Sequence, residues 1–319
     1  MGRCMTLTMP DGAVTIDPHL GILRELRFWD GRKWLDPLQA AAGAGGTVDF
    51  NCGPCGGAGQ GGESPWELRE VVQSGREALA RLSLGHVVQG ASVEKEVSLR
   101  KGEPILYQSH MLTGGQGVLN LGHFPVVRMA RGGQLSFSPK QPAGEGELMP
   151  CARDIPAQGG SLASRCAQGG PVELGAGDAS VAETRVTLVE AAGNSLAWTA
   201  VLRHAEQDIV FVLRDPGMLP VTTLWQAEDG RELGIGDGCA PGDGARRRHR
   251  ECGTDGACPL ALAPSRVHRV RHAIGAVPCP EGWTHVTAIS IDQNTLRLEG
   301  DGDGTICLPF DGRFFVRVS

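Results

Sequence analysis

The chain of 319 residues is long enough to bury a sizeable core, and its 41% hydrophobic content excludes a mainly disordered protein. The 47 glycines and 20 prolines favour many turns over long helices. A net charge of −6 argues against a nucleic-acid-binding protein and suits a neutral small-molecule partner. The first residues, MGRCMTLTMPDG, contain no apolar secretory segment, and no run approaches the length of a membrane span. We therefore expect a cytoplasmic protein that binds neither nucleic acid nor membranes, as a monomer or a homodimer.

The N-terminal part of the chain predicts paired β-strands. Residues 5–16 form a hairpin around the Pro-Asp-Gly turn at 10–12, and residues 21–29 form a strand before the Asp-Gly turn at 30–31. Two glycine-rich stretches, 40–46 and 53–62, are expected to be loops. Residues 66–74 and 77–84 are expected to be paired strands.

The most regular pattern lies between residues 78 and 129. In Ala91–Leu99 apolar and polar residues alternate strictly, which is typical of a half-buried strand. A polar turn follows at 100–104, and strands are expected at 105–111 and 118–121. His123 then lies just past a predicted strand end, beside Phe124 and Pro125.

Residues 132–180 predict only short strands among loops, and the rest of the chain again predicts regular strands. Further strands are expected at 184–189, 196–203, 209–213, 222–226, 267–277, 284–291, 295–298, 305–308 and 313–318. A polar loop is expected at 236–256. Without an internal repeat or a long amphipathic helix, the chain predicts an all-β domain spanning residues 1–319, folded as a large twisted antiparallel double-sheet sandwich.

The order of these elements resembles the galactose mutarotase-like family, which includes the aldose 1-epimerases. A Lys-containing strand, a Gly-x-Pro-hydrophobic-Tyr strand and a strand ending in His-x-Pro occur in that order. The matching residues are Lys95, Gly102, Pro104, Tyr107 and His123, and later matches are Leu224-Trp225-Gln226, Leu233-Gly234-Ile235 and Leu262-Ala263-Pro264. The resemblance covers the chain as an order of elements and implies a divergent branch of the family.

The resemblance implies acid–base chemistry on a sugar. A histidine such as His123 protonates the ring oxygen, because imidazole titrates near neutral pH. His110, at a strand end upstream, is expected to face the same cleft. The family's base is a Glu that follows Leu-Gly-Ile, and here that position is Gly236. Asp237 is the next residue, although a one-residue shift in a strand points to the other face, and Glu232 and Glu228 are alternatives.

Three further residues are candidates for sugar binding. For each tryptophan, packing in the core is the alternative, and that alternative is strongest for Trp198. Trp66 and Trp225 offer rings that stack on a sugar, and Arg231 offers hydrogen-bond donors. The family's second His, which precedes a Trp, has only Gly61-Gly62 in its place. The function predicted is carbohydrate binding with aldose 1-epimerase chemistry. The alternative is a non-catalytic sugar-binding or regulatory protein on the same fold. Neither needs a cofactor or a metal ion.

Ten cysteines suggest other chemistry. Cys52-Gly-Pro-Cys55 has the spacing of a thioredoxin site, so a thiol-redox protein is a third alternative. The glycines after Cys55 do not support the helix that such a site needs to lower the thiol pKa. Cys252 and Cys258 are too far apart for a tight zinc knuckle. Free, mostly buried thiols are the favoured interpretation.

Two polar runs have simpler explanations than ligand binding. The basic run at 246–250 has no interleaved aromatics and is expected to be a solvated loop. The Asp-Gly-Asp-Gly sequence at 301–304 lacks the later Glu of a calcium loop and is expected to be a hairpin turn.

Overall fold

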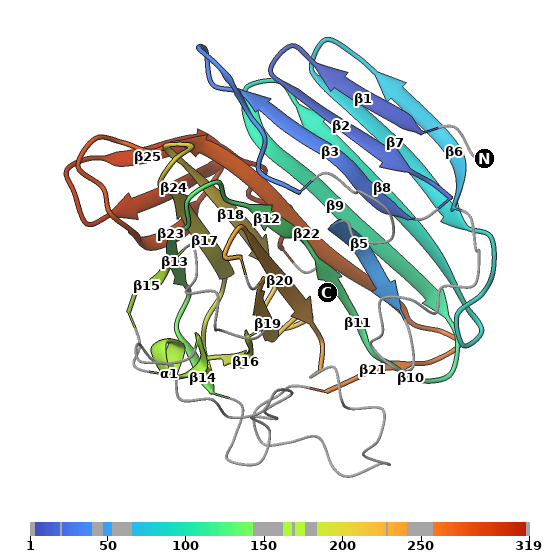
Figure 1. Ribbon diagram of the computed structural model, residues 1–319. Helices are drawn as coiled ribbons and strands as arrows, with labels where there is room; N and C mark the ends of the chain where they lie inside the picture. The colour runs from blue at the N-terminus through green and yellow to red at the C-terminus, as the bar shows by residue number, and fades with distance from the viewer. Residues whose placement is uncertain are drawn as a thin grey trace.

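The protein consists mainly of three stacked β-sheets (Figure 1). The computed structural model describes residues 4–19, 21–39, 47–52, 66–142, 162–167, 170–175, 184–227, 229–240 and 258–316. Two large antiparallel sheets face each other, and a smaller sheet covers part of the outer face of one of them. The all-β double-sheet sandwich predicted from the sequence is confirmed. Among the described residues, no helix has the length and apolar character needed to cross a membrane.

The first sheet has eleven strands. Its main path is β1 (Met5–Met9), β2 (Gly12–Asp17), β3 (Ile22–Trp29), β5 (Thr47–Cys52), β11 (Leu121–Phe124), β20 (Glu232–Gly238), β19 (Val221–Gln226), β16 (Thr184–Glu190) and β14 (Lys140–Pro142), with β4 (Trp34–Leu35) on β3 and β12 (Val126–Arg128) on β20.

The second sheet has nine strands. In spatial order they are β15 (Val172–Leu174), β13 (Gly133–Phe137), β17 (Ala197–Arg203), β18 (Asp208–Arg214), β22 (Val267–Pro278), β9 (Glu103–Gly114), β8 (Ala91–Arg100), β7 (Glu77–Leu84) and β6 (Trp66–Gln73).

The remaining elements are small. The third sheet contains β23 (Val286–Asp292), β24 (Thr295–Gly300) and β25 (Thr305–Pro309), and β10 (Gly117–Leu119) pairs with β21 (Leu260–Leu262). One helix of six residues, α1 (Leu162–Ala167), is present in the described part of the chain.

Two hydrophobic cores hold the layers together. The larger lies between the first and second sheets, and the smaller lies between the second and third sheets and includes Phe211, Trp198 and Leu298. Every residue of β17 and β18 is buried, because these strands have a sheet on each face. Their sequences are therefore nearly continuous apolar runs rather than alternating ones.

Several strand boundaries differ from the prediction. The strand expected at 313–318 is wrong for residues 313–316, which form a turn in which the Phe314 amide donates to the Asp311 carbonyl at 2.8 Å. His123 lies inside β11 rather than past a strand end, and residues 236–238 belong to β20 rather than to the following loop. Pairing with neighbouring strands extends both elements beyond what their short apolar runs indicate. The loops predicted at 40–46 and 53–62 lie outside the described residues.

The smaller core allows a direct test of packing. A Cβ on Gly275 of β22 would lie 2.1 Å from Cζ of Phe211, so we expect Gly275→Ala to lower the free energy of unfolding by about 1–3 kcal/mol through overpacking. The matched control is Gly75→Ala, where a Cβ meets no atom within 4 Å, and we expect a change within about 0.5 kcal/mol. Urea unfolding followed by tryptophan fluorescence measures both. Equal midpoints for the two variants would contradict this packing.

Candidate functional site

A cluster of polar side chains lies inside the larger core, between the first and second sheets. His123 of β11 and Asp237 of β20 are cross-strand neighbours in the first sheet, so both side chains point to the same face. His110 of β9 and His272 of β22 come from the second sheet and meet them from the other side. All four side chains are at most 2% exposed. Strand alternation thus delivers ionisable groups to an interior otherwise filled by aliphatic residues.

The three imidazoles lie next to one another, and two of them are stacked. The rings of His123 and His272 are nearly parallel, at 6°, with centroids 4.4 Å apart. The His110 ring lies 5.0 Å from the His123 ring, and the Trp66 ring lies 6.0 Å from His110. The cluster therefore joins His123 to two of the other residues proposed from the sequence, His110 and Trp66.

Asp237 fixes the orientation and tautomer of His272. Nε2 of His272 lies 3.3 Å from Oδ2 of Asp237. An ionised carboxylate can only accept, so Nε2 carries the proton and Nδ1 presents a lone pair. Nδ1 is buried and has no hydrogen-bond partner. A carboxylate that holds one imidazole nitrogen and leaves the other as an acceptor is the arrangement of a general base.

An ionic network continues from Asp237 across the interior. Nη1 of Arg214 lies 2.9 Å from Oδ1 of Asp237, and its Nη2 lies 2.5 Å from Oε1 of Glu190. Lys140 forms a second ion pair with Glu190, and Thr222 donates to Asp237 at 3.3 Å. These charges are 0–3% exposed, so each carboxylate needs its cation to offset the loss of hydration.

The network sets the protonation of Asp237. Burial by itself raises the pKa of Asp237, but Arg214 and the hydrogen bond from His272 outweigh burial, and the net pKa lies below its usual value. Asp237 is therefore ionised at neutral pH. Because it is already paired with a guanidinium, it is a weak proton acceptor, and its main effect is on His272.

The histidines are neutral at pH 7. Burial is the main cause that lowers the pKa of His123 well below its usual value, and the nearby cationic forms of His272, His110 and Lys95 lower it further. Burial likewise lowers the pKa of His272, and Asp237 only partly compensates. The contact between His272 and Asp237 is thus a hydrogen bond from a neutral imidazole rather than an ion pair.

Lys95 of β8 completes the cluster. It is the cross-strand neighbour of His110, is 1% exposed, and its Nζ lies 5.3 Å from the Trp66 ring centroid. Burial lowers the pKa of Lys95 to about 7. A lysine that titrates near neutral pH can donate or accept a proton, and such shifts are concentrated at functional sites.

Gln108 adds hydrogen-bonding capacity beside His272. The two residues are cross-strand neighbours on β9 and β22. Gln108 is 1% exposed, yet neither its Oε1 nor its Nε2 has a hydrogen-bond partner. A buried amide without partners is costly, so this side chain is suited to a hydroxyl-bearing ligand that supplies both a donor and an acceptor.

The comparisons with known proteins agree on the architecture. A proposed aldose 1-epimerase from Escherichia coli K12 has a TM-score of 0.59 and 13% identity, with 86% of this chain and 98% of that chain covered. A galactose mutarotase-related enzyme from Lactobacillus acidophilus has a TM-score of 0.57 and 10% identity, with 88% and 99% covered. A galactose mutarotase-like protein from Clostridium acetobutylicum has a TM-score of 0.59 and 10% identity, with 86% and 95% covered.

The chain has the galactose mutarotase-like fold. The resemblance predicted from the sequence is confirmed at this level, and identities of 8–13% mark a divergent example of the fold. No protein-family model matches the sequence, and no curated protein sequence matches it either.

The family resemblance assigns the base to position 236, and the ring of Phe124 occupies the space in which a side chain at that position would lie. Gly236 points to the outer face of the first sheet, opposite to Asp237 and His123. A Cβ on Gly236 would lie 2.9 Å from Cδ2 of Phe124, and one on Gly234 would lie 2.6 Å from its Cζ. A carboxylate side chain therefore has no room at Gly236, and any base must come from another residue.

The other predicted site residues are not part of the cluster. Trp225 lies on the outer face of the first sheet beside Gly234, and its Nε1 is buried without a hydrogen-bond partner. Glu232 precedes Asp237 by five residues, about 17 Å along an extended strand, and points to the outer face. Arg231 precedes β20, and Glu228 lies outside the described residues. Trp198 belongs to the smaller core, as its packing interpretation predicts.

Sequence reasoning missed several members of the cluster: His272, Gln108, Arg214, Glu190 and Lys140. A signal was available for two of them. His272 interrupts an apolar face of β22 between Val270 and Ile274, and Arg214 ends the continuous apolar run of β18. A charged or titratable residue at an inward position of a buried strand indicates a buried polar partner.

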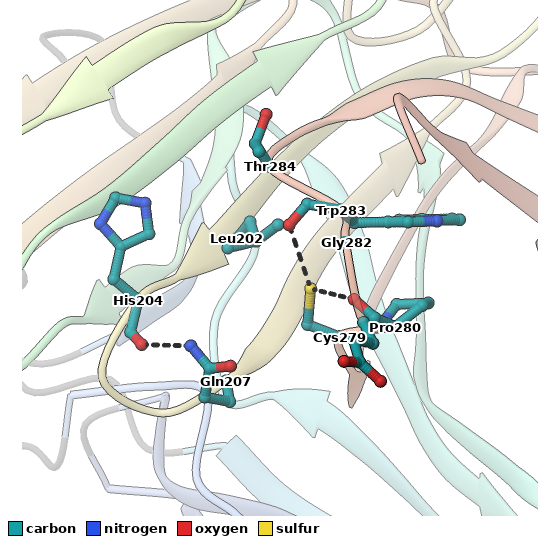
Figure 2. Close-up of a pocket in the computed structure, with 9 residues that line it drawn as sticks. Leu202, His204, Gln207, Cys279, Pro280, Gly282, Trp283 and Thr284 are labelled. Atoms are coloured by element: carbon teal, nitrogen blue, oxygen red, sulfur yellow. Dashed lines mark hydrogen bonds between the residues drawn. The ribbon is translucent and has the colours of Figure 1, made fainter. Parts of the chain in front are cut away.

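Two pockets on the described part of the surface lie away from the cluster. A pocket of about 360 Å³ lies beside the β17–β18 turn, where Figure 2 shows His204, Gln207, Cys279 and Trp283 around it. A second hollow, of about 190 Å³, is lined by residues that include Trp34 and Glu206. Neither pocket contains a residue of the cluster. Several titratable groups converge in the cluster, so it is a better indication of function than either pocket.

The cysteines give little support for thiol chemistry. Of the described free thiols, Cys166 and Cys239 are buried, Cys279 is half-buried, and Cys4 and Cys307 are exposed. Burial raises the pKa of Cys166 and of Cys279 to about 11, which makes both thiols unreactive.

The expectation of only free thiols is wrong for Cys258, which is disulfide-bonded. Cys52 ends β5, and Cys55 lies outside the described residues, so the dithiol remains a prediction. Within the described ranges, no group of three or more His, Cys, Asp or Glu side chains is arranged to hold a metal ion.

The ionic network has a measurable energetic consequence. We expect Arg214→Met to lower the free energy of unfolding by about 3–5 kcal/mol, because Asp237 is left buried without its cation. The matched control is Arg81→Met, since Arg81 also contacts two carboxylates, those of Glu70 and Glu96, but is 52% exposed. There we expect a loss of about 0–1 kcal/mol. Urea unfolding at pH 7 separates the two, and a loss below about 1 kcal/mol for Arg214→Met would refute the network's importance.

Proposed function

We propose that the protein binds a sugar and interconverts its anomers by acid–base chemistry at the buried cluster around His123. The observation that carries this proposal is the pair of stacked imidazoles of His123 and His272, with His272 held by Asp237. Burying three imidazoles, a lysine and a carboxylate costs free energy that aliphatic residues would not cost. Such an arrangement supports a functional site, and the mutarotase-like fold supports a sugar as its substrate.

The proposed reaction has a proton acceptor and a proton donor. The base removes the proton from the anomeric hydroxyl, the acid protonates the ring oxygen, and the bond from the anomeric carbon to the ring oxygen breaks. The open-chain aldehyde rotates, and the reverse steps close the ring on either face. General acid and general base each contribute about 10²–10⁴-fold in typical enzymes.

The residues that fit these roles differ in part from the sequence-based assignment. His272 is suited to be the base, because its Nδ1 lone pair is held in place through Asp237. Lys95, with a pKa of about 7, is suited to be the acid because a large fraction carries the proton at neutral pH. His123 is neutral, so its N–H group is suited to hydrogen-bond the sugar rather than to protonate it. Gln108 is placed to recognise a hydroxyl beside His272.

The burial of the cluster adds a requirement. The three imidazoles, Lys95 and Asp237 are at most 2% exposed, so a sugar reaches them only through an opening motion of the protein. Such motions occur in microseconds to milliseconds and limit the turnover of many enzymes.

A non-catalytic sugar-binding or regulatory protein on the same fold is the second candidate. Two observations favour it: Phe124 fills the family's base position at Gly236, and Asp237 is neutralised by Arg214. Measurement of anomer exchange separates the two candidates, because binding without acceleration supports only the second.

The first functional prediction concerns the histidine pair. We expect the protein to accelerate mutarotation of freshly dissolved α-aldoses, and we expect His272→Ala and Asp237→Asn to lower the rate by about 10²–10⁴-fold by removing or misorienting the base. Polarimetry measures the rate across glucose, galactose and mannose. Glu232→Gln is the matched control and should leave the rate unchanged, since Glu232 points to the outer face. Full activity of His272→Ala would exclude His272 as the base.

The second functional prediction concerns pH. Lys95 donates only in its charged form, so the rate should fall as pH rises through about 7, the pKa of Lys95. Lys95→Met should be slow throughout and should lack this alkaline decline. The titratable groups that interact with Lys95 are His110 and His123, and both are neutral in this range. An unchanged alkaline limb in Lys95→Met would assign the titration to another group.

A further inference from the structure

We propose a second sugar-binding site on the surface, formed by Trp29, Trp34 and the hollow that contains Glu206, with a neutral saccharide unit as its ligand. The two tryptophans are cross-strand neighbours on β3 and β4, and they are 40% and 38% exposed. They project from the outer face of the first sheet, away from the buried cluster. The inference does not depend on the proposed catalytic function.

The tryptophans form an aromatic platform held by an ordered turn. Their ring centroids are 5.4 Å apart, and the planes meet at 58°. Oδ1 of Asp30 accepts the Arg32 and Lys33 amides, both at 2.7 Å, which fixes the turn between the strands. Single exposed apolar side chains are ordinary, whereas adjacent ones that form a patch rimmed by polar residues mark sites of interaction. The contact between these two tilted rings leaves more than a third of each residue exposed.

The hollow beside this platform contains a buried acceptor without a partner. Oε1 of Glu206 accepts the Ala130 amide at 2.8 Å, whereas its Oε2 is buried and has no hydrogen bond. Trp34 lines the same hollow, whose volume is about 190 Å³. This is smaller than the roughly 300–1,000 Å³ of pockets for drug-sized ligands, so a group the size of a single sugar ring fits better.

The charge of the lining indicates a neutral ligand. Three cationic side chains and three carboxylates surround the hollow: Lys33, Arg128 and Arg203, and Asp36, Glu206 and Asp208. Arg203 and Asp208 are already paired, with Nη2 and Oδ2 2.6 Å apart. An anion or a cation would meet as much repulsion as attraction, whereas hydroxyl groups can donate to carboxylates and accept from cations.

A saccharide combines the required properties. One face of a pyranose ring presents C–H groups, which pack on an indole, and its edge presents hydroxyls, one of which can donate to Oε2 of Glu206. Arg27 lies over one face of Trp34, with its Cζ 4.7 Å from the ring centroid, so the ligand uses the ring surface that remains exposed.

The test is saturation-transfer difference NMR with the methyl α- and β-glycosides of glucose, galactose and mannose. Methyl glycosides cannot mutarotate, so turnover at the buried cluster does not affect the signal. We expect at least one glycoside to bind the wild type. Trp34→Ala should weaken that binding by at least about tenfold, and Glu206→Gln by about three- to tenfold. Val267→Ala, at a position 59% exposed on β22, should leave it unchanged.

His123→Ala separates this site from the buried cluster. Binding that survives His123→Ala and is lost in Trp34→Ala supports the surface site, whether or not the protein accelerates mutarotation. Binding that is lost in His123→Ala but kept in Trp34→Ala overturns the proposal and assigns the sugar to the cluster. Absence of binding by the wild type to all of these glycosides also overturns it. Thermal unfolding midpoints close to that of the wild type verify that each variant is folded.

Discussion

The ion pair between Arg214 and Asp237 connects the two large sheets inside the buried polar cluster. Arg214 ends β18 in the second sheet, and Asp237 lies in β20 of the first, yet both are completely buried. In a low-dielectric interior a lone charge is very costly, so each residue requires the other. The same carboxylate holds His272, and the same guanidinium holds Glu190, so several polar side chains depend on this one pair.

Burial and neighbouring charges have different net effects on the pKa values of the groups in the cluster. Arg214 keeps Asp237 ionised despite burial, whereas burial keeps His123 and His272 neutral. A neutral imidazole held by a carboxylate is a proton acceptor, and a lysine that titrates near pH 7 is a proton donor. The interior thus contains a candidate proton acceptor and a candidate proton donor, although none of the residues involved is exposed.

The fold accommodates this site without the carboxylate of the resembling family. On β20, residues 235 and 237 face inward and residues 234 and 236 face outward, so a catalytic group at 236 and the imidazole of His123 would lie on opposite faces of the sheet. The ring of Phe124 occupies the space above Gly234 and Gly236. Neighbouring residues of β20 point to opposite faces of the sheet, so the side chain of residue 237, and not that of residue 236, lies beside His123.

The sequence by itself determined the fold class and much of the strand order. Strict alternation in Ala91–Leu99 and the turn signals around it are local, and local patterns specify a strand and its buried face. His123, His110 and Trp66 could also be identified as site candidates, because the strands that carry or precede them could be predicted. The ends of β11 and β20 could not be predicted, because pairing with strands that are distant in sequence determines where these short strands end.

Only the tertiary structure decided which chemical groups meet. His272 lies 149 residues from His123, and Arg214 lies 23 residues from Asp237, yet nothing in their local sequence indicates those partners. The reason is physical: alternation fixes the face to which a side chain points, whereas the register between strands and the stacking of two sheets fix what lies opposite. The same stacking decided that Trp225 and Glu232 lie on the outer face, away from the histidines.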